Sequence, residues 1–178
     1  AIEYLRNKGH EISIKFIGGG TGKAQKEFKS LIAKLDPKHD YIEQLDFISH
    51  DQLPNLIAAA DIFVFASSCE NMPNTLIEGM SSGMPIACSN RGPMPEVLKD
   101  GGVYFDPEDY ISISNAIELI IHNDDLRCRI ASRSKELSES YSWAKCGKQT
   151  FEYLIKVYQD QKQIQEARVP KDNRYRPN

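Results

Sequence analysis

The chain has 178 residues, of which 40% are hydrophobic and 26% are charged, as expected for a globular protein with a substantial core. Its formal net charge of −3 argues against a nucleic-acid-binding protein, which normally presents a basic surface. No apolar run approaches the roughly 18 residues of a membrane-spanning helix, and four widely spaced cysteines without a CxxC pair favour neither a disulfide framework nor a metal cluster.

Hydrophobic periodicity predicts strands and helices in regular alternation. In chain order the predicted elements are helix 1–9, strand 12–17, helix 23–35, strand 41–47, helix 53–60, strand 62–65, helix 73–82, strand 85–89, helix 95–98, strand 103–105 and helices 107–122, 125–140 and 143–165. This alternation predicts an α/β protein with one doubly wound, Rossmann-like parallel sheet. We expect residues 1–165 to form the domain and the polar tail 166–178 to be loosely ordered.

The polar loops that could bind a ligand all follow strands. Their positions predict that they share the ligand-binding edge of the sheet. The Gly18–Gly22 loop allows a ligand to approach the backbone closely. It fits neither the GxGxxG fingerprint nor the P-loop pattern, so a flexible turn explains it equally well.

The segment from Glu70 to Glu78 carries the strongest signal. Pro73 suits the first position of a helix and Asn71 is a candidate cap, which would leave the amides of residues 74–76 free. Free amides at the positive end of a helix dipole favour a diphosphate. A carboxylate can accept hydrogen bonds from two neighbouring hydroxyls, so Glu78 suits a ribose and Glu70 a second sugar. A capping role for Glu70 and a solvated helical position for Glu78 remain the alternatives.

Other reactive or aromatic residues have simpler expected roles. Cys69 has no histidine near it in sequence that could activate it, so we expect a small buried apolar residue. The four histidines stand at turns and helix ends, where surface positions are expected. Trp143 begins the last helix and is expected to anchor it in the core, and Ser49 or Asp51 is expected to cap helix 53–60.

Taken in order, these motifs resemble glycosyltransferase family 4, whose members are retaining, nucleotide-sugar-dependent enzymes of the GT-B fold. The pattern ExxxxxxxE over Glu70–Glu78 is the central likeness. The other matching segments are residues 17–20 (IGGG), 46–49 (DFIS) with Leu53, 59–64 (AADIFV), 83–86 (GMPI), 92–97 (GPMPEV) and 105–107 (FDP). The resemblance covers about residues 1–165 and implies the C-terminal, donor-binding half of that fold.

The resemblance also implies a role for each matching residue. Glu78 would hold the ribose hydroxyls, and Glu70, the predicted catalytic residue, would contact the donor sugar. The remaining donor-binding residues that it implies are Gly18, Gly19, Ile48, Ser49, Asn71, Met72, Asn74, Thr75 and Leu76. It implies a UDP-, GDP- or ADP-linked sugar as the substrate, with no cofactor and no essential metal, and transfer with retention to a hydroxyl of a glycan or lipid-linked acceptor.

Some features of the family pattern are absent or altered. Many members have Glu-Gly-Phe-Gly where this chain has Glu70–Pro73, so the donor sugar stays open. The family's diphosphate-binding Arg and Lys, and its acceptor domain, precede the segment matched here, so we expect activity only in a full-length protein. We expect that protein in the cytoplasm. The alternative is a cytoplasmic protein that associates peripherally with the inner face of the membrane. The alternatives are a GT-B-like epimerase or phosphorylase, or a non-catalytic nucleotide-binding module.

Overall fold

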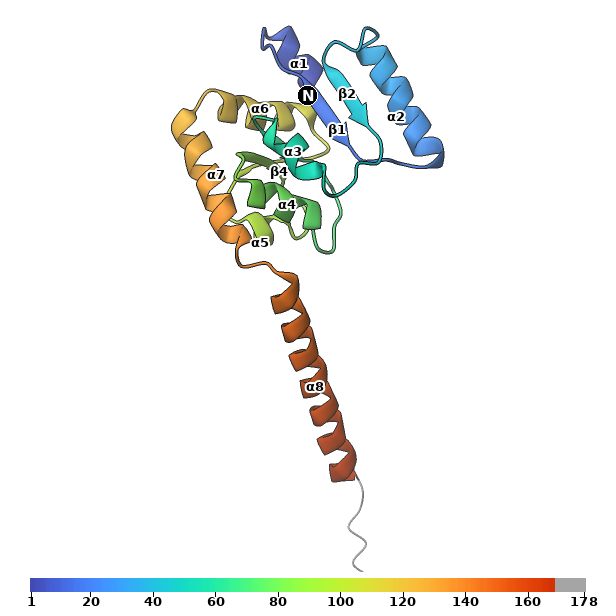
Figure 1. Ribbon diagram of the computed structural model, residues 1–178, viewed down its shortest axis with the longest axis vertical. Coiled ribbons are helices and arrows are strands. Elements are labelled where there is room, and N and C mark those ends of the chain that lie inside the picture. The colour runs from blue at the N-terminus through green and yellow to red at the C-terminus, as the bar shows by residue number, and fades with distance from the viewer. Residues whose placement is uncertain (169–178) are drawn as a thin grey trace, which may run out of the picture. The chain divides into compact units, whose positions relative to one another are not determined.

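The structure, a computed structural model, describes residues 1–168. Its contacts divide the chain into a first unit, Ala1–Glu139, and a second unit that begins at Ser140. Figure 1 shows the elements along the chain. They are α1 (Ile2–Asn7), β1 (Ile14–Ile17), α2 (Gly22–Leu35), β2 (Ile42–Leu45), α3 (Leu53–Ala58), β3 (Phe63–Phe65), α4 (Asn74–Ser82), β4 (Ile86–Ser89), α5 (Met94–Leu98), β5 (Val103–Phe105), α6 (Tyr110–Ile121), α7 (Asp124–Ser138) and α8 (Trp143–Arg168). Every predicted strand and helix is present.

The strands of the first unit are all parallel, which confirms the predicted α/β class. β1 pairs with β2, and β4 lies between β3 and β5 with Phe63 opposite Ile86 and Ala87 opposite Val103. All four residues of β4 are buried, as expected for a central strand covered on both faces. We expected one continuous sheet, but within the described residues no ladder joins the pair β1–β2 to the other three strands. β1 differs from β4 in that three of its four residues are exposed.

The core of the first unit fixes the three-stranded sheet against its helices. It comprises Leu5, Ala87, Phe105, Ala116, Ile117, Ile120 and Ile130. These residues come from α1, β4, β5, α6 and α7, so elements distant in sequence depend on one another for burial. The packed sheet holds the carboxyl ends of β3, β4 and β5 at one edge, where the loops that follow them leave the core.

The observed ends of α3 and α4 can be compared with the predicted capping residues. Gly83 closes α4 with a φ of 73°, a left-handed conformation that favours glycine, which confirms the predicted C-cap. The predicted N-caps are wrong. Pro73 occupies the N-cap position of α4 without a side-chain bond, so Asn71 does not cap it. Gln52 holds the N-cap position of α3, and the Ser49 hydroxyl instead lowers the pKa of the Asp51 carboxyl.

The second unit consists of the helix α8 in its described part. Ser142 precedes this helix, and its hydroxyl accepts a hydrogen bond from the Lys145 amide at 3.2 Å. Trp143 is 82% exposed, so the expectation of a core anchor is wrong. Within residues 1–168, no helix combines the length and the apolar character that crossing a membrane requires. The predicted tail overlaps the end of α8 at residues 166–168, and its residues 169–178 lie outside the described residues.

Candidate functional site

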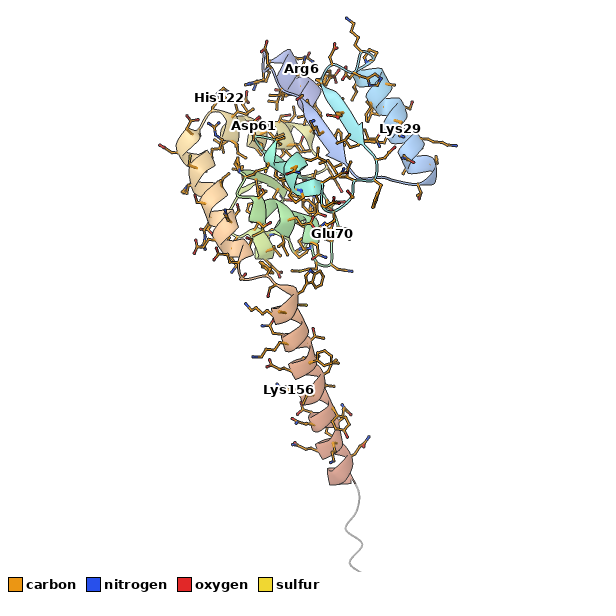
Figure 2. All side chains as sticks on the ribbon, viewed as in Figure 1. Arg6, Lys29, Asp61, Glu70, His122 and Lys156 are labelled. Carbon is orange, nitrogen blue, oxygen red and sulfur yellow. The ribbon has the colours of Figure 1, made fainter. Side chains whose placement is uncertain are left out.

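Glu70 lies on the loop between β3 and α4 (Figure 2). Glu78 lies within α4. Both side chains are half-buried. Cys69 beside Glu70 is exposed, which contradicts the expectation of a buried apolar residue. Its position explains the difference, because the chain has already left the packed strand at Phe65 and reaches the surface before α4 begins. The Ser67 hydroxyl donates to the carbonyl of Cys69 at 3.2 Å and shapes this turn.

The start of α4 offers fewer free amides than the sequence predicts. The Asn74 amide donates to the Met72 carbonyl at 2.9 Å, so it is not free. The Ile77 amide closes the first turn on the Pro73 carbonyl at 3.1 Å. Between them, the amides of Thr75 and Leu76 donate to no protein acceptor among the described residues. Leu76 is buried as a whole residue, so its amide does not reach the surface, whereas the neighbouring Thr75 is exposed and can offer its amide to a ligand.

The contact between α4 and β3 fixes the rotation of this helix. A Cβ atom added at Gly79 would come within 2.7 Å of the Phe63 ring, so glycine allows the helix to approach the strand closely. Gly79 and Met80 are both buried, and Glu78 precedes them in the same helical turn. The position of Glu78 is therefore set by core packing rather than by a flexible loop.

The loops after β4 and β5 are joined by an ion pair that the sequence does not reveal. Arg91 Nη2 donates to both carboxylate oxygens of Asp106, at 3.0 Å each. The Glu108 amide and the Arg91 guanidinium together hold the pKa of the Asp106 carboxyl below its usual value. The Asn90 amide also donates to the Phe105 carbonyl at 2.9 Å. The pair links two turns that the sequence analysis identified separately, but no local pattern connects residues 15 positions apart.

Gly92 brings the same turn against the Glu70 loop. It has a φ of +53°, in the left-handed region that favours glycine, and a Cβ atom added there would lie 4.0 Å from the Glu70 carbonyl oxygen. The loops after three adjacent strands are therefore contiguous, with Glu70, Arg91 and Asp106 at the carboxyl edge of one parallel sheet. That edge is where open α/β sheets bind their ligands.

A second group of predicted residues gathers at the carboxyl ends of β1 and β2. The Gly18 amide donates to the Leu45 carbonyl at 3.0 Å, and a Cβ atom added at Gly19 would lie 3.9 Å from the Phe47 amide nitrogen. Ile48 and Ser49 follow directly and are half-buried. The structure thus brings the glycine loop and the 46–49 turn together. That these residues share a single site with Glu70 and Glu78 stays a prediction.

Two further features lie away from these loops. A shallow hollow of about 440 Å³ lies at the amino ends of β1 and β2, where Ser13 and Tyr41 are among its lining residues. That edge is opposite to the one where the glycine loop leaves the sheet. The side chains that could hold a metal ion, His10, Glu118 and His122, are also distant in the fold from the carboxyl edge of β3–β5, since they flank α1 and the end of α6.

Several solved structures share this fold. Sucrose-phosphate synthase from Thermosynechococcus elongatus is 20% identical with a TM-score of 0.74, and the match covers 89% of this chain and 42% of that one. Anabaena HepE, solved in complex with UDP-glucose, is 22% identical with a TM-score of 0.73, and the match covers 82% of this chain and 41% of that one. The first unit therefore has the Rossmann-like architecture of one half of a GT-B fold.

Curated relatives of this chain are named as glycosyltransferases. O-antigen chain mannosyltransferase B of Escherichia coli is 34% identical over 113 residues, which cover 64% of this chain and 30% of that protein. An uncharacterized glycosyltransferase of Methanocaldococcus jannaschii is 27% identical over 147 residues, which cover 82% of this chain and 41% of that protein. The chain thus spans less than half the length of these relatives. The family model described as glycosyl transferases group 1 matches residues 1–137, and the chain belongs to that family.

Proposed function

We propose that this chain is the donor-binding domain of a retaining hexosyltransferase of glycosyltransferase family 4. The full-length protein would transfer a sugar from a nucleoside diphosphate to a hydroxyl of a glycan or lipid-linked acceptor. Family membership supports transferase chemistry, and the ordered motifs around Glu70 and Glu78 support the family 4 assignment. Activity is proposed for the full-length protein, because the chain corresponds to less than half of its relatives' length.

The observation that carries this proposal is the contiguity of the strand-end loops. Glu70, the Gly92 turn and the Arg91–Asp106 pair meet at one edge of a parallel sheet, next to a helix whose exposed Thr75 has an amide with no protein acceptor among the described residues. This amide, at the positive end of α4, can donate a hydrogen bond to a diphosphate oxygen. Carboxylates on either side of that helix end supply acceptors for sugar hydroxyls.

In the proposed reaction the acceptor hydroxyl attacks the anomeric carbon, the nucleoside diphosphate leaves with the bonding electron pair, and the hydroxyl proton passes to the leaving diphosphate. Glu78 holds the ribose through two hydroxyls, and Glu70 orients the donor sugar. The Thr75 amide stabilises part of the charge that develops on the leaving diphosphate, a role for which preorganised donors are effective. Arg91 is paired with Asp106 and is therefore not assigned to the diphosphate.

Relatives suggest which donors to test first. HepE was solved with UDP-glucose, and the Escherichia coli relative is named as a mannosyltransferase. These names support hexose donors linked to UDP or GDP as the first candidates. Because the base is expected to be contacted by backbone near Ile48 and Ser49, side chains give little indication of which nucleotide is preferred.

The test is calorimetric titration of UDP, GDP and ADP, and of their hexose conjugates, into the full-length protein. Loss of hydrogen bonds to a charged group typically costs about 1.5–3 kcal/mol, so Glu78→Ala should weaken nucleotide binding roughly 10- to 100-fold. Glu70→Ala should weaken binding of the conjugate but not of the free nucleotide. Glu136→Ala, which removes an exposed carboxylate on α7, is the matched control and should change neither affinity.

The outcomes separate the proposal from its alternatives. Nucleotide affinity that is unchanged by Glu78→Ala would contradict the assigned ribose contact. Incubating the protein with the preferred donor and analysing the products by NMR distinguishes the reaction types: transfer with retention supports the proposal, whereas conversion of the donor alone indicates an epimerase. Tight binding without any turnover of donor and acceptor would indicate a nucleotide-binding module.

A further inference from the structure

Four polar residues of the first unit meet on the side of the fold where α1 leads into β1. His10 precedes β1, whereas Glu118 lies in the last turn of α6 and His122 directly follows that helix (Figure 2). His10 Nε2 lies 3.0 Å from Glu118 Oε1, and the rings of His10 and His122 have centroids 5.3 Å apart. Lys8 Nζ contacts both oxygens of Glu118 at 2.5 Å. His122 is exposed, as expected for a surface histidine, whereas His10 is half-buried and its ring lies against that of His122.

We propose that His10, Glu118 and His122 form a binding site for a divalent transition metal ion of the zinc class. One ligand atom from each of the three side chains lies within 4.8 Å of the other two. Metal–ligand bonds of about 2.0–2.1 Å in a tetrahedron place ligand atoms about 3.3 Å apart, so small side-chain rotations complete the site. Water supplies the fourth ligand.

The donor set decides which ion is favoured. Two imidazole nitrogens and one carboxylate oxygen suit zinc and its first-row neighbours. Magnesium and calcium prefer six or more oxygen ligands, which this group does not supply. Glu118 and His122 are four positions apart at the end of one helix, so their side chains project to the same face. The third ligand then comes from His10, 108 positions earlier than Glu118.

Lys8 is the competitor for this site. Its ammonium group holds the Glu118 carboxylate, with side-chain exposures of 39% and 23%. Partly exposed ion pairs of this kind are weak, because solvent screens them and both side chains lose rotational freedom. A metal ion with three protein ligands can therefore displace the ammonium group, which is free to turn to solvent on its flexible stem. Lys8 lowers metal affinity without preventing binding.

The metal would act as a structural clamp. It would fasten the segment between α1 and β1 to the end of α6, two elements that the chain separates by more than 100 residues. Leu5 of α1 and Ile117 of α6 already share the hydrophobic core, so the clamp would reinforce a contact that exists without it. This role is independent of donor binding at the opposite edge of the sheet.

The test uses tag-free, chelator-treated protein titrated with zinc sulfate by calorimetry, with cobalt absorption spectra to report the coordination. We expect one equivalent to bind. Loss of an outer-shell partner alone typically costs roughly 10- to 100-fold in metal affinity, so His122→Ala and Glu118→Gln should each lower zinc affinity by at least that factor. Lys8→Met should raise it. His50→Ala removes an exposed histidine outside the cluster and should leave it unchanged.

Thermal melting gives a second readout. Zinc should raise the melting temperature of the unmodified protein and of His50→Ala, but not that of His122→Ala. His122 is exposed, so its variant is expected to fold, which circular dichroism without metal can verify. Zinc affinity that is unaffected by His10→Ala and His122→Ala, or equal affinity for magnesium, would overturn the proposal. Neither measurement depends on a nucleotide or a sugar, so failure of the metal-site proposal and failure of the proposed transferase function can be told apart.

Discussion

Asp36 is a buried carboxylate that closes the carboxyl end of α2. It is 2% exposed, and its oxygens accept hydrogen bonds from the amides of Asp40, Tyr41 and Ile42 at 2.8–2.9 Å. Burial alone would raise its pKa, but these three amides outweigh burial and hold the pKa below its usual value. One side chain thereby determines how the chain turns from α2 into β2.

This arrangement predicts an acid-dependent contribution to stability. Because the folded-state pKa of Asp36 is depressed, its contribution is complete above about pH 4 and is lost as pH falls through the folded-state value. Asp36→Asn should lower the melting temperature at pH 7 by several degrees, since an amide cannot accept at both positions, and should flatten the acid dependence. Asp40→Asn, at an exposed position, is the control. Equal melting curves for Asp36→Asn and the unmodified protein from pH 3 to pH 7 would refute this role.

The burial of cysteines also differs sharply from residue to residue. Cys88 in β4 is fully buried, and burial raises its pKa to about 12, so its thiol is protonated and shielded from solvent. Cys69 at the start of the Glu70 loop is exposed. The predicted strand ends at Phe65, as β3 does, so the strand end was not the source of the error. Cysteine is among the residues most often buried, which favours the interior as a default, but Cys69 lies on the loop beyond the strand.

At the scale of elements, the position of α4 in the predicted site depends on its close approach to β3 at Gly79. Alanine is normally preferred to glycine within a helix by about 1 kcal/mol. At Gly79, however, a methyl group would come within 2.7 Å of the half-buried Phe63 ring. Overpacking of this kind typically costs about 1–3 kcal/mol. The helix must then move away from the strand, and Glu78 must move with it.

We therefore expect Gly79→Ala to destabilise the protein by about 1–2 kcal/mol, despite the gain in helix propensity. Urea unfolding followed by circular dichroism measures the change. Gly147→Ala in α8 is the matched control, because a Cβ atom there would meet nothing within 4 Å, and it should be neutral or stabilising. If Gly79→Ala proved as stable as Gly147→Ala, the close approach would not constrain the helix.

The carboxyl end of α4 was predictable because it follows from local chemistry. The Gly83 cap needs only a residue that tolerates positive φ, and the position of α4 was predicted to within one residue. The N-caps were not predictable, because several polar residues compete at each helix start. At α4 the N-cap position is occupied by Pro73. Its ring is buried and its ψ of 73° is not helical, so the helix begins one residue later than expected.

At the scale of the whole molecule, the sequence predicts which loops carry function but not how they meet. The succession of strands and helices is enough to place Gly18, Ile48, Glu70 and Glu78 after or beside parallel strands. The contacts that join those loops depend on the strand order and on individual rotamers. The Arg91–Asp106 pair and the division between β1–β2 and β3–β5 are therefore visible only in three dimensions.

The exposed thiol of Cys69 gives a chemical reporter one residue from the predicted donor carboxylate. In a variant with Cys128 and Cys146 replaced by serine, maleimide should modify Cys69 and spare the buried Cys88. Bound nucleotide sugar should slow that modification, whereas free nucleotide should protect less, and mass spectrometry of timed aliquots measures both rates. Alkylation that proceeds at one rate with and without saturating donor would place the sugar elsewhere. An electrophile built onto a donor analogue would, by the same logic, become a site-directed covalent inhibitor.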